Sequence, residues 1–180
     1  MSVYITGGSL HRRAVSIPDL QGLRPTSAKV RQALFNILGQ IQHKTVLDLF
    51  SGSGLMSLEA LSRGAIVTSV ECEKRACHEQ QKLKEKWQLE QWRIVHGQVE
   101  SQLHKLKGQS FDMVFADPPY DSGWCQKIPQ LLSKYQINTS SLIIEELASI
   151  QPCWPQPWIC RDSRRYGQTN LHFLESSPRT

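Results

Sequence analysis

The stretch FADPPYDSGW, residues 115–124, ends an apolar run with an acid, two prolines and an aromatic ring. The carboxylate of Asp117 can accept a hydrogen bond from an amine. Pro118 and Pro119 stiffen the backbone and carry no N–H, so the Asp117 and Pro118 carbonyls can also accept. Tyr120 offers a flat face on which a base can stack. These residues predict a site that holds the exocyclic amine of a base for attack on an electrophile; the competing interpretation is a stiff loop capped by Asp117.

A second stretch, LDLFSGSG, residues 47–54, predicts a binding loop for a nucleoside. Gly52 and Gly54 allow the backbone to turn tightly and to approach a ligand closely. The helix expected after them presents free N–H groups at the same place. Glu71 ends the next apolar segment, seventeen positions after Gly54. A carboxylate there can accept hydrogen bonds from both hydroxyls of a ribose.

The charge pattern of this loop favours S-adenosylmethionine over a dinucleotide. The dinucleotide fingerprint G-x-G-x-x-G/A fails, because Ser57 stands at its third small position. Asp48 lies just before the turn, where it would repel a pyrophosphate but attract an amino group and a sulfonium. The purely structural alternative is a glycine turn beside an acid on the protein surface.

Alternating strands and helices are expected to position both stretches. Residues 28–38 have helical spacing of apolar side chains, with Thr26 or Ser27 able to cap the start and Gly39 the end. Near-continuous apolar runs separated by helical segments predict a parallel sheet with helices on both faces. The expected strands are TVLDLF (45–50), IVTSVE (66–71), WRIVHG (92–97), FDMVFA (111–116) and SLIIEEL (141–147). PWICRD (157–162) and TNLHFLE (169–175) are expected to form an antiparallel pair at one side.

Composition sets broad limits on the class of protein. The chain has 180 residues, 39% of them hydrophobic and 21% charged, as expected for one globular unit. A formal net charge of +5 permits a polyanionic partner without requiring one. Five cysteines without a C-x-x-C pair, and six histidines without a ligand pattern, argue against disulfides and metal. No membrane-spanning run or secretion signal is visible, so we expect a cytoplasmic protein, and a monomer.

Several segments together resemble the RsmD family, S-adenosylmethionine-dependent methyltransferases that modify the N2 amine of a guanine in small-subunit (16S) ribosomal RNA. The similarity extends over almost the whole chain. DPPY is shared with DNA adenine methyltransferases, whereas GLRPT before a helix and EALSRGA are more specific. The matching segments are ITGG, GLRPTSAKVRQALFNIL, LDLFSGSGLMSLEALSRGA, VECEKRA, FADPPY and RRYGQTNLHFL.

The resemblance implies a Rossmann-like class I methyltransferase fold of the α/β class. It implies a mostly parallel sheet with an antiparallel C-terminal strand pair, preceded by a small N-terminal β-hairpin and helix. We expect residues 1–43 to contact RNA and cofactor, and residues 44–180 to form the methyltransferase domain. The implied cofactor residues are Arg24, Pro25 and Thr26 near the methionine, Asp48, Phe50, Gly52 and Gly54 in the loop, Glu71 at the ribose and Gln98 near the adenine. The implied catalytic residues are Asp117, Pro118, Pro119 and Tyr120, and the RNA-binding residues of the hairpin are Arg12 and Arg13.

Two positions depart from the family pattern. Arg12 occupies a place in the hairpin that is usually glycine, and Ser57 replaces a usual glycine in the first helix after the cofactor loop. Glu145 is expected at a strand end that faces the site, with either a substrate-orienting or a structural role. Trp154 and Trp158 are expected to anchor a loop rather than to stack on a base.

Two rival functions stay open at the level of the sequence. The acceptors around Asp117 suit any exocyclic amine, so the chain could methylate N6 of adenine in DNA or RNA. It could also be a non-catalytic RNA-binding assembly factor, although the intact DPPY stretch argues against that. The leading interpretation needs ribosomal RNA or the small ribosomal subunit as its partner, and no metal or membrane.

Overall fold

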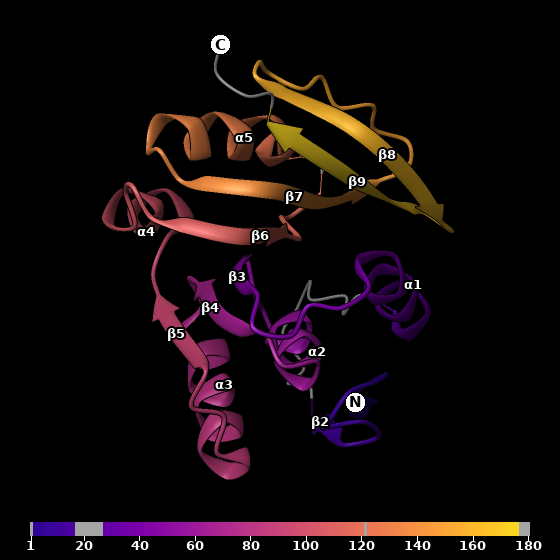
Figure 1. Ribbon diagram of the computed structural model, residues 1–180, viewed down its shortest axis with the longest axis vertical. Helices are drawn as coiled ribbons and strands as arrows, with labels where there is room; N and C mark the ends of the chain where they lie inside the picture. Colours follow the sequence, from indigo (N-terminus) through magenta and orange to yellow (C-terminus); the bar gives the residue numbers. More distant parts are fainter. Residues whose placement is uncertain (1, 17–26, 121, 177–180) are drawn as a thin grey trace.

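A computed structural model describes residues 2–16, 27–120 and 122–176 of the chain. A seven-stranded sheet runs in the order β5-β4-β3-β6-β7-β9-β8 (Figure 1). The first five strands in this order are parallel, β9 is antiparallel to β7, and β8 is antiparallel to β9. The strands are β3 (Thr45–Leu49), β4 (Ile66–Glu71), β5 (Trp92–His96), β6 (Ser110–Ala116), β7 (Asn138–Leu147), β8 (Trp158–Tyr166) and β9 (Thr169–Ser176). The predicted mostly parallel sheet with an antiparallel C-terminal pair is confirmed.

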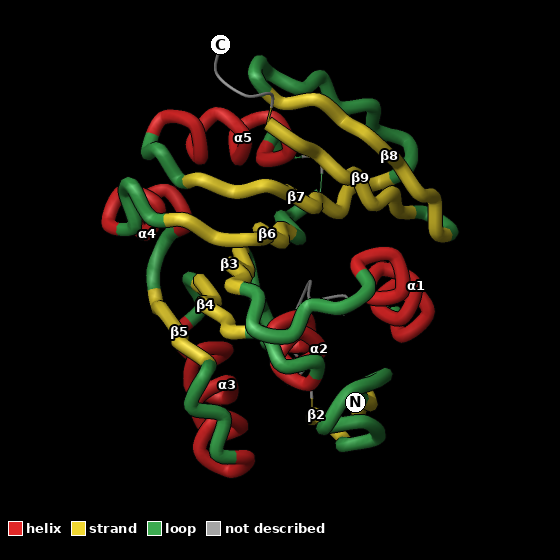
Figure 2. The backbone as a smooth tube through the Cα atoms, in the orientation of Figure 1, coloured by secondary structure: helices red, strands yellow, loops and turns green. Residues whose placement is uncertain are grey.

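Helices cover both faces of this sheet, as Figure 2 shows. They are α1 (Ala28–Leu38), α2 (Leu55–Ser62), α3 (Lys74–Trp87), α4 (Val99–Lys105) and α5 (Trp124–Lys134). Val46 of β3 packs with Leu34 of α1 and Leu58 of α2 in one apolar cluster. Leu47 of the same strand packs on the other face, in a cluster with Leu103 of α4 and Ile128 of α5. Burial on both faces is why the central strands read as continuous apolar runs.

The N-terminal hairpin lies against the outer side of α2. Its strands β1 (Ser2–Tyr4) and β2 (Ala14–Ser16) are antiparallel, with Ser2 opposite Ser16. The loop between them contacts the last residue of α2, where the Ser9 backbone N–H donates to the Ser62 carbonyl at 2.7 Å. Gly8 has φ 78°, and a Cβ there would lie 2.0 Å from the Ser62 carbonyl oxygen. Glycine is therefore required for this close approach.

A buried carboxylate joins the hairpin, α1 and α2. Glu59 of α2 is 0% exposed and accepts hydrogen bonds from the Thr6 backbone N–H at 2.9 Å and hydroxyl at 2.8 Å. The Arg31 Nε of α1 donates to Glu59 at 3.0 Å, and Arg63 donates to it from the end of α2. Arg31 also donates to the Tyr4 carbonyl at 2.8 Å. Nothing in the sequence pattern indicated this network.

The ends of α1 follow the sequence expectation. The Ser27 hydroxyl caps the helix by accepting from the Val30 backbone N–H at 3.3 Å, and Gly39 closes it at φ 66°. The proposed domain division after residue 43 stays a prediction. Ile5 and Val15, from before that boundary, share one apolar cluster with Val46, which lies after it. None of the helices in the described part of the chain is long and apolar enough to cross a membrane.

Candidate active site

Three of the predicted site residues, Asp48, Glu71 and Asp117, lie at the carboxyl edge of the parallel strands. The chain adds β4 and β5 on one side of β3 and then crosses over to place β6 on the other side. Ligands in open α/β sheets bind at such a switch point, beyond the carboxyl ends of the strands. Asp48 is the penultimate residue of β3, and Asp117 follows directly after β6. The topology therefore brings the two predicted motifs to one place.

A glutamine that sequence reasoning missed fixes the cofactor loop. Gln80 of α3 is 0% exposed, and its side-chain amide donates to the Ser51 hydroxyl at 2.9 Å and to the Gly52 carbonyl at 2.8 Å. A Cβ on Gly54 would lie 2.8 Å from Trp92 and 2.9 Å from Gln80, and its φ is 75°. The loop thus depends on glycine at this position. Gln80 lies four residues after Ala76, an expected inward residue of the same helix, and this spacing could have identified Gln80 as buried.

Glu71 is held in place by the backbone before any ligand arrives. Its Oε2 accepts from the Gly52 N–H at 2.7 Å, and its Oε1 accepts from the Glu73 N–H at 2.7 Å. An ionised carboxylate has about four acceptor sites, so two such bonds leave capacity for the hydroxyls of a ribose. The side chain is 8% exposed, at the edge where a ligand would lie.

Asp48 is a buried acid with a hydrogen-bonded partner. The Ser57 hydroxyl donates to Asp48 Oδ2 at 2.5 Å, and the two residues are 0% and 3% exposed respectively. Burial raises the pKa of Asp48 to about 7, Ser57 opposes that rise, and the charge of Glu71 adds to it. Ser57, one of the two departures from the family pattern, thus contacts a predicted cofactor residue directly. A cationic ligand beside Asp48 would favour its ionised form.

Asp117, the first residue of the predicted catalytic loop, lines the same cavity as Asp48. Asp48, Asp117 and Glu145 line one small cavity together with apolar side chains of Leu34, Met56, Phe115, Ile143 and Leu171. Its volume of about 20 Å³ suits one amino or methyl group rather than a whole base. The Tyr120 hydroxyl donates to Glu145 Oε1 at 3.1 Å. Burial, followed by the nearby charges of Glu145 and Asp117, raises the pKa of Tyr120, so its hydroxyl stays protonated.

The Pro119 carbonyl of this loop accepts a hydrogen bond, whereas the acceptor role expected of the Asp117 and Pro118 carbonyls stays a prediction. The Ser122 hydroxyl donates to the Pro119 carbonyl and closes the turn before α5. The φ angle that a proline fixes limits how far this turn can deform.

Of the remaining predicted cofactor residues, the structure describes Phe50 and Gln98 but not residues 24–26. Phe50 takes φ 60°, unusual for a bulky residue, and its ring meets Trp124 with centroids 5.0 Å apart. Gln98 is exposed at the start of α4, just after β5, on the carboxyl edge of the sheet. Residues 24–26, the predicted Arg24, Pro25 and Thr26, lie outside the described residues.

The two predicted RNA-binding arginines lie on the hairpin and differ in their surroundings. Arg12 has φ 64°, the left-handed conformation that the usual glycine would adopt without strain. It borders a hollow with Tyr4 and Ser27. The Arg13 guanidinium lies 5.4 Å from the ring centroid of Trp87, the last residue of α3. Both are exposed, and Figure 1 shows the hairpin below α2, with β6 above that helix.

The two tryptophans have the structural character expected of them. Trp158 is 4% exposed, and its indole N–H donates to the Pro129 carbonyl at 3.0 Å and to the Ser133 hydroxyl at 3.1 Å. Trp154 packs edge-on against His172, with ring centroids 5.2 Å apart. Trp158 therefore anchors its loop to α5.

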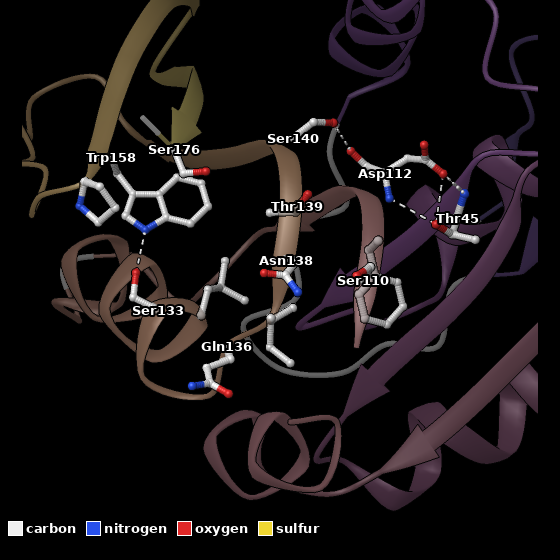
Figure 3. Close-up of a pocket in the computed structure, with 14 residues that line it drawn as sticks. Thr45, Ser110, Asp112, Ser133, Gln136, Asn138, Thr139, Ser140, Trp158 and Ser176 are labelled. Carbon is white, nitrogen blue, oxygen red and sulfur yellow. Dashed lines mark hydrogen bonds between the residues drawn. The ribbon is translucent and has the colours of Figure 1, made fainter. Parts of the chain in front are cut away.

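A wider hollow of about 650 Å³ lies at the opposite, amino edge of the sheet (Figure 3). The side chain of Asp112 points to Thr45 there, accepting from its N–H at 2.8 Å and its hydroxyl at 2.9 Å. Ser140 donates to the Asp112 carbonyl at 2.8 Å. These contacts join the amino-terminal parts of three strands, β3, β6 and β7. Among the residues that the structure describes, no group of three or more metal-ligating side chains occurs.

The residues at the carboxyl edge fit S-adenosylmethionine. The Glu71 carboxylate is fixed beside the Gly52 N–H, where the predicted ribose contact would be made, and the glycine loop is fixed by its packing against Gln80. Asp48 is a buried acid whose pKa is raised to about 7, chiefly because burial makes its ionised form electrostatically costly. A pyrophosphate would increase that electrostatic cost, whereas an ammonium and a sulfonium would reduce it.

Comparison with known proteins agrees with this geometry. The family model described as "Conserved hypothetical protein 95" matches residues 3–175. Ribosomal RNA small subunit methyltransferase D of Escherichia coli is 32% identical over 96% of this chain and 89% of its own length. The protein of that name from Buchnera aphidicola is 31% identical over 87% of this chain and 84% of its own. A solved Escherichia coli structure that bears a methyltransferase name superimposes with a TM-score of 0.86 at 28% identity, over 99% of this chain and 100% of that one. The chain therefore belongs to the RsmD family, the family of ribosomal RNA small subunit methyltransferase D.

Proposed function

We propose that this protein transfers a methyl group from S-adenosylmethionine to the N2 amine of a guanine in small-subunit ribosomal RNA. The observation that carries the proposal is the shared cavity of Asp48 and Asp117 at the switch point of the sheet. Membership of the RsmD family supports the RNA substrate, and the acceptor chemistry of the cavity supports an amine as the target.

The cofactor side of the site binds and orients. Bound S-adenosylmethionine supplies a methyl group made electrophilic by the positive charge on sulfur. Glu71 holds the ribose, and Asp48 balances the positive charge of the ligand. Gln98 and Phe50 would contribute to holding the nucleoside part of the cofactor. Because Gln80 already fixes that loop, little ordering is needed when the ligand binds.

The substrate side of the site holds the nucleophile. An aromatic amine is a weak nucleophile because its lone pair is delocalised into the ring. Asp117 and the Pro118 carbonyl accept from the two amine hydrogens, which raises electron density on nitrogen and aims its lone pair at the methyl group. Tyr120 stacks on the base. Asp117 need not be a strong base, because an amine that has gained a methyl group and a positive charge is very acidic.

The RNA must present its base to this edge of the sheet. A guanine flipped out of its stack reaches the cavity, and unstacking costs a few kcal/mol. Arg12 and Arg13 bind phosphates away from the base, so affinity depends on salt. The cytoplasmic location and monomeric state expected from the sequence stay part of this proposal.

The test is a methylation assay followed by nucleoside analysis. The purified protein is incubated with labelled S-adenosylmethionine and small ribosomal subunits that lack guanine-N2 methylation, and the RNA is digested to nucleosides. Label in N2-methylguanosine supports the proposal. Label in N6-methyladenosine keeps the amine chemistry and refutes the base assignment.

An Asp117→Ala variant separates catalysis from binding. We expect it to fold and to bind both S-adenosylmethionine and subunits, but to lose at least about 100-fold in kcat. Normal methylation by this variant would overturn the proposed mechanism. Binding of subunits without any methylation by the wild-type protein would favour the non-catalytic assembly factor.

A further inference from the structure

We propose that Glu145 selects guanine by accepting a hydrogen bond from the N1–H of the base while Asp117 accepts from the neighbouring N2 amine. The inference rests on the proposed function and assigns the choice of base within that site. It gives Glu145 a role in specificity.

The register of the sheet places the two carboxylates side by side. β6 and β7 are parallel neighbours, with Phe115 opposite Ile143 and Ala116 opposite Ile144. Asp117 and Glu145 are the next residues along each strand, so both side chains stand on the face that Phe115 and Ile143 occupy. Neighbouring strands lie about 4.8 Å apart, and both acids line the same small cavity.

Two adjacent acceptors match the edge of guanine and clash with that of adenine. Guanine presents two neighbouring donors there, the N1–H and the N2 amine. Adenine presents one donor, the N6 amine, next to the N1 lone pair. A carboxylate that faces that lone pair is repelled by it and gains no hydrogen bond from the base. A pair of acids therefore rejects adenine even though its amine could reach Asp117.

Glu145 is buried, and a hydrogen bond from Tyr120 restricts the orientation of its carboxylate. It is 7% exposed, so its hydrogen bonds are weakly screened by water. The Tyr120 hydroxyl donates to its Oε1 at 3.1 Å and orients the carboxylate. An ionised carboxylate accepts about four hydrogen bonds, so a bond to the base is compatible with those it already makes. The ring that would stack on the base thus also orients the group that would read it.

The experiment removes the N1–H from the base and the charge from the acid. RNA substrates carry guanine or 2-aminopurine at the methylated nucleotide; 2-aminopurine keeps the N2 amine but has a lone pair at N1. We expect wild-type kcat/KM to favour guanine by about 10- to 100-fold, as the loss of a charge-assisted hydrogen bond predicts. Glu145→Gln should reduce that ratio by at least about fivefold, because its amide can donate to N1 of 2-aminopurine. Comparing the ratios cancels other differences between the two bases.

Two further variants isolate the role of Glu145. Glu146→Gln makes the same change one residue later on the opposite face, where Cys125 donates to that side chain at 3.1 Å, and it should keep the wild-type ratio. Tyr120→Phe keeps the ring but removes the hydroxyl. If Glu145 acted only by positioning Tyr120, Tyr120→Phe would lower the ratio as much as Glu145→Gln does. We expect a change of less than about threefold.

Each outcome bears on a distinct claim. An unchanged ratio in a Glu145→Gln variant that binds S-adenosylmethionine and methylates guanine overturns the specificity role alone. Absence of N2-methylguanosine with the wild-type protein refutes the proposed function, and this inference with it. If Glu145→Gln does not fold, the wild-type protein still decides, since equal kcat/KM on the two bases overturns the inference.

Discussion

Ser57 and Asp48 form a 2.5 Å hydrogen bond in which both side chains are buried. The serine hydroxyl donates, so the bond stabilises the ionised acid against the burial that favours its neutral form. Glycine, the usual residue of the family at this place, has no side chain to donate. This protein therefore has an added means of keeping a charge beside the expected sulfonium.

Removing that hydroxyl should shift cofactor binding to higher pH. In Ser57→Ala the pKa of Asp48 rises above its present value of about 7, so less of the acid is ionised at neutral pH. We expect S-adenosylmethionine affinity to fall by about tenfold at pH 7 and by less at pH 9. Calorimetric titration from pH 6 to 9 measures this. Ser133→Ala, which removes a hydroxyl at the opposite edge, should leave the profile unchanged.

Asp48 should also link stability to pH in the ligand-free protein. Its pKa is raised from 3.8 to about 7 in the folded state, so the folded protein holds a proton that the unfolded chain has lost. Stability from this group is present below about pH 4 and is lost as pH rises toward 7. In Asp48→Asn, urea unfolding should show a smaller decrease over that range. The same variant should bind S-adenosylmethionine about 10- to 100-fold more weakly, and unchanged affinity would refute its role in the cofactor site.

The buried network around Glu59 should dominate the attachment of the hairpin. Glu59→Ala leaves the fully buried Arg31 without its carboxylate partner and should cost about 3–5 kcal/mol in unfolding free energy. Glu79→Gln, which breaks an exposed pair with Lys82, should change stability by less than about 1 kcal/mol. Equal effects of the two substitutions in urea unfolding would contradict this account.

Arg12 should lower the stability of the hairpin through backbone strain while adding a positive charge that can bind RNA. Its φ of 64° costs a residue with a side chain about 1 kcal/mol, which glycine avoids. Arg12→Gly should therefore raise unfolding free energy by about that amount while weakening RNA binding at low salt. Arg13→Gly should remove charge without the gain in stability, because Arg13 does not have positive φ. A loss of stability in Arg12→Gly would show that the side chain has structural contacts that matter more.

An arginine on the C-terminal hairpin should contact RNA near the catalytic edge. Arg164 of β8 lies opposite Leu171 of the neighbouring strand β9. Leu171 lies in turn opposite Glu145 of β7. The Arg164 side chain is 56% exposed and held at 2.7 Å by Asp162. Arg164→Gln should weaken subunit binding and lower the slope of log affinity against log salt by about 0.7–0.9. Arg161→Gln, paired with Glu175 nearer the other end of β8, provides the comparison.

Local patterns in the sequence predicted the elements of the fold well. The bounds of α1 and β4 agree with their apolar spacing and flanking residues, because each pattern reports burial against one sheet. The carboxyl ends of the strands then placed Asp48, Glu71 and Asp117 at one edge, since parallel strands share a direction.

Contacts between distant segments could not be predicted in the same way. Arg31 lies on an amphipathic helix and Glu59 on a short helix that is buried nearly all round, and only their packing shows that the two side chains are paired. Gln80 stands in a strongly charged segment, yet it faces inward and supports the cofactor loop. Ser57 departs from the expected family pattern, but its contact with Asp48 depends on how α2 packs against β3.

The attachment of the hairpin through Glu59 has a consequence for how an RNA could be read. The turn that carries Arg12 and Arg13 is locked to α2, and α2 begins at the cofactor loop, so the span between the basic turn and the catalytic loop is set by the fold. An RNA that touches both must offer a phosphate and an extruded base at that fixed separation. The protein would then act as a gauge, accepting its target by the dimensions of a folded RNA surface.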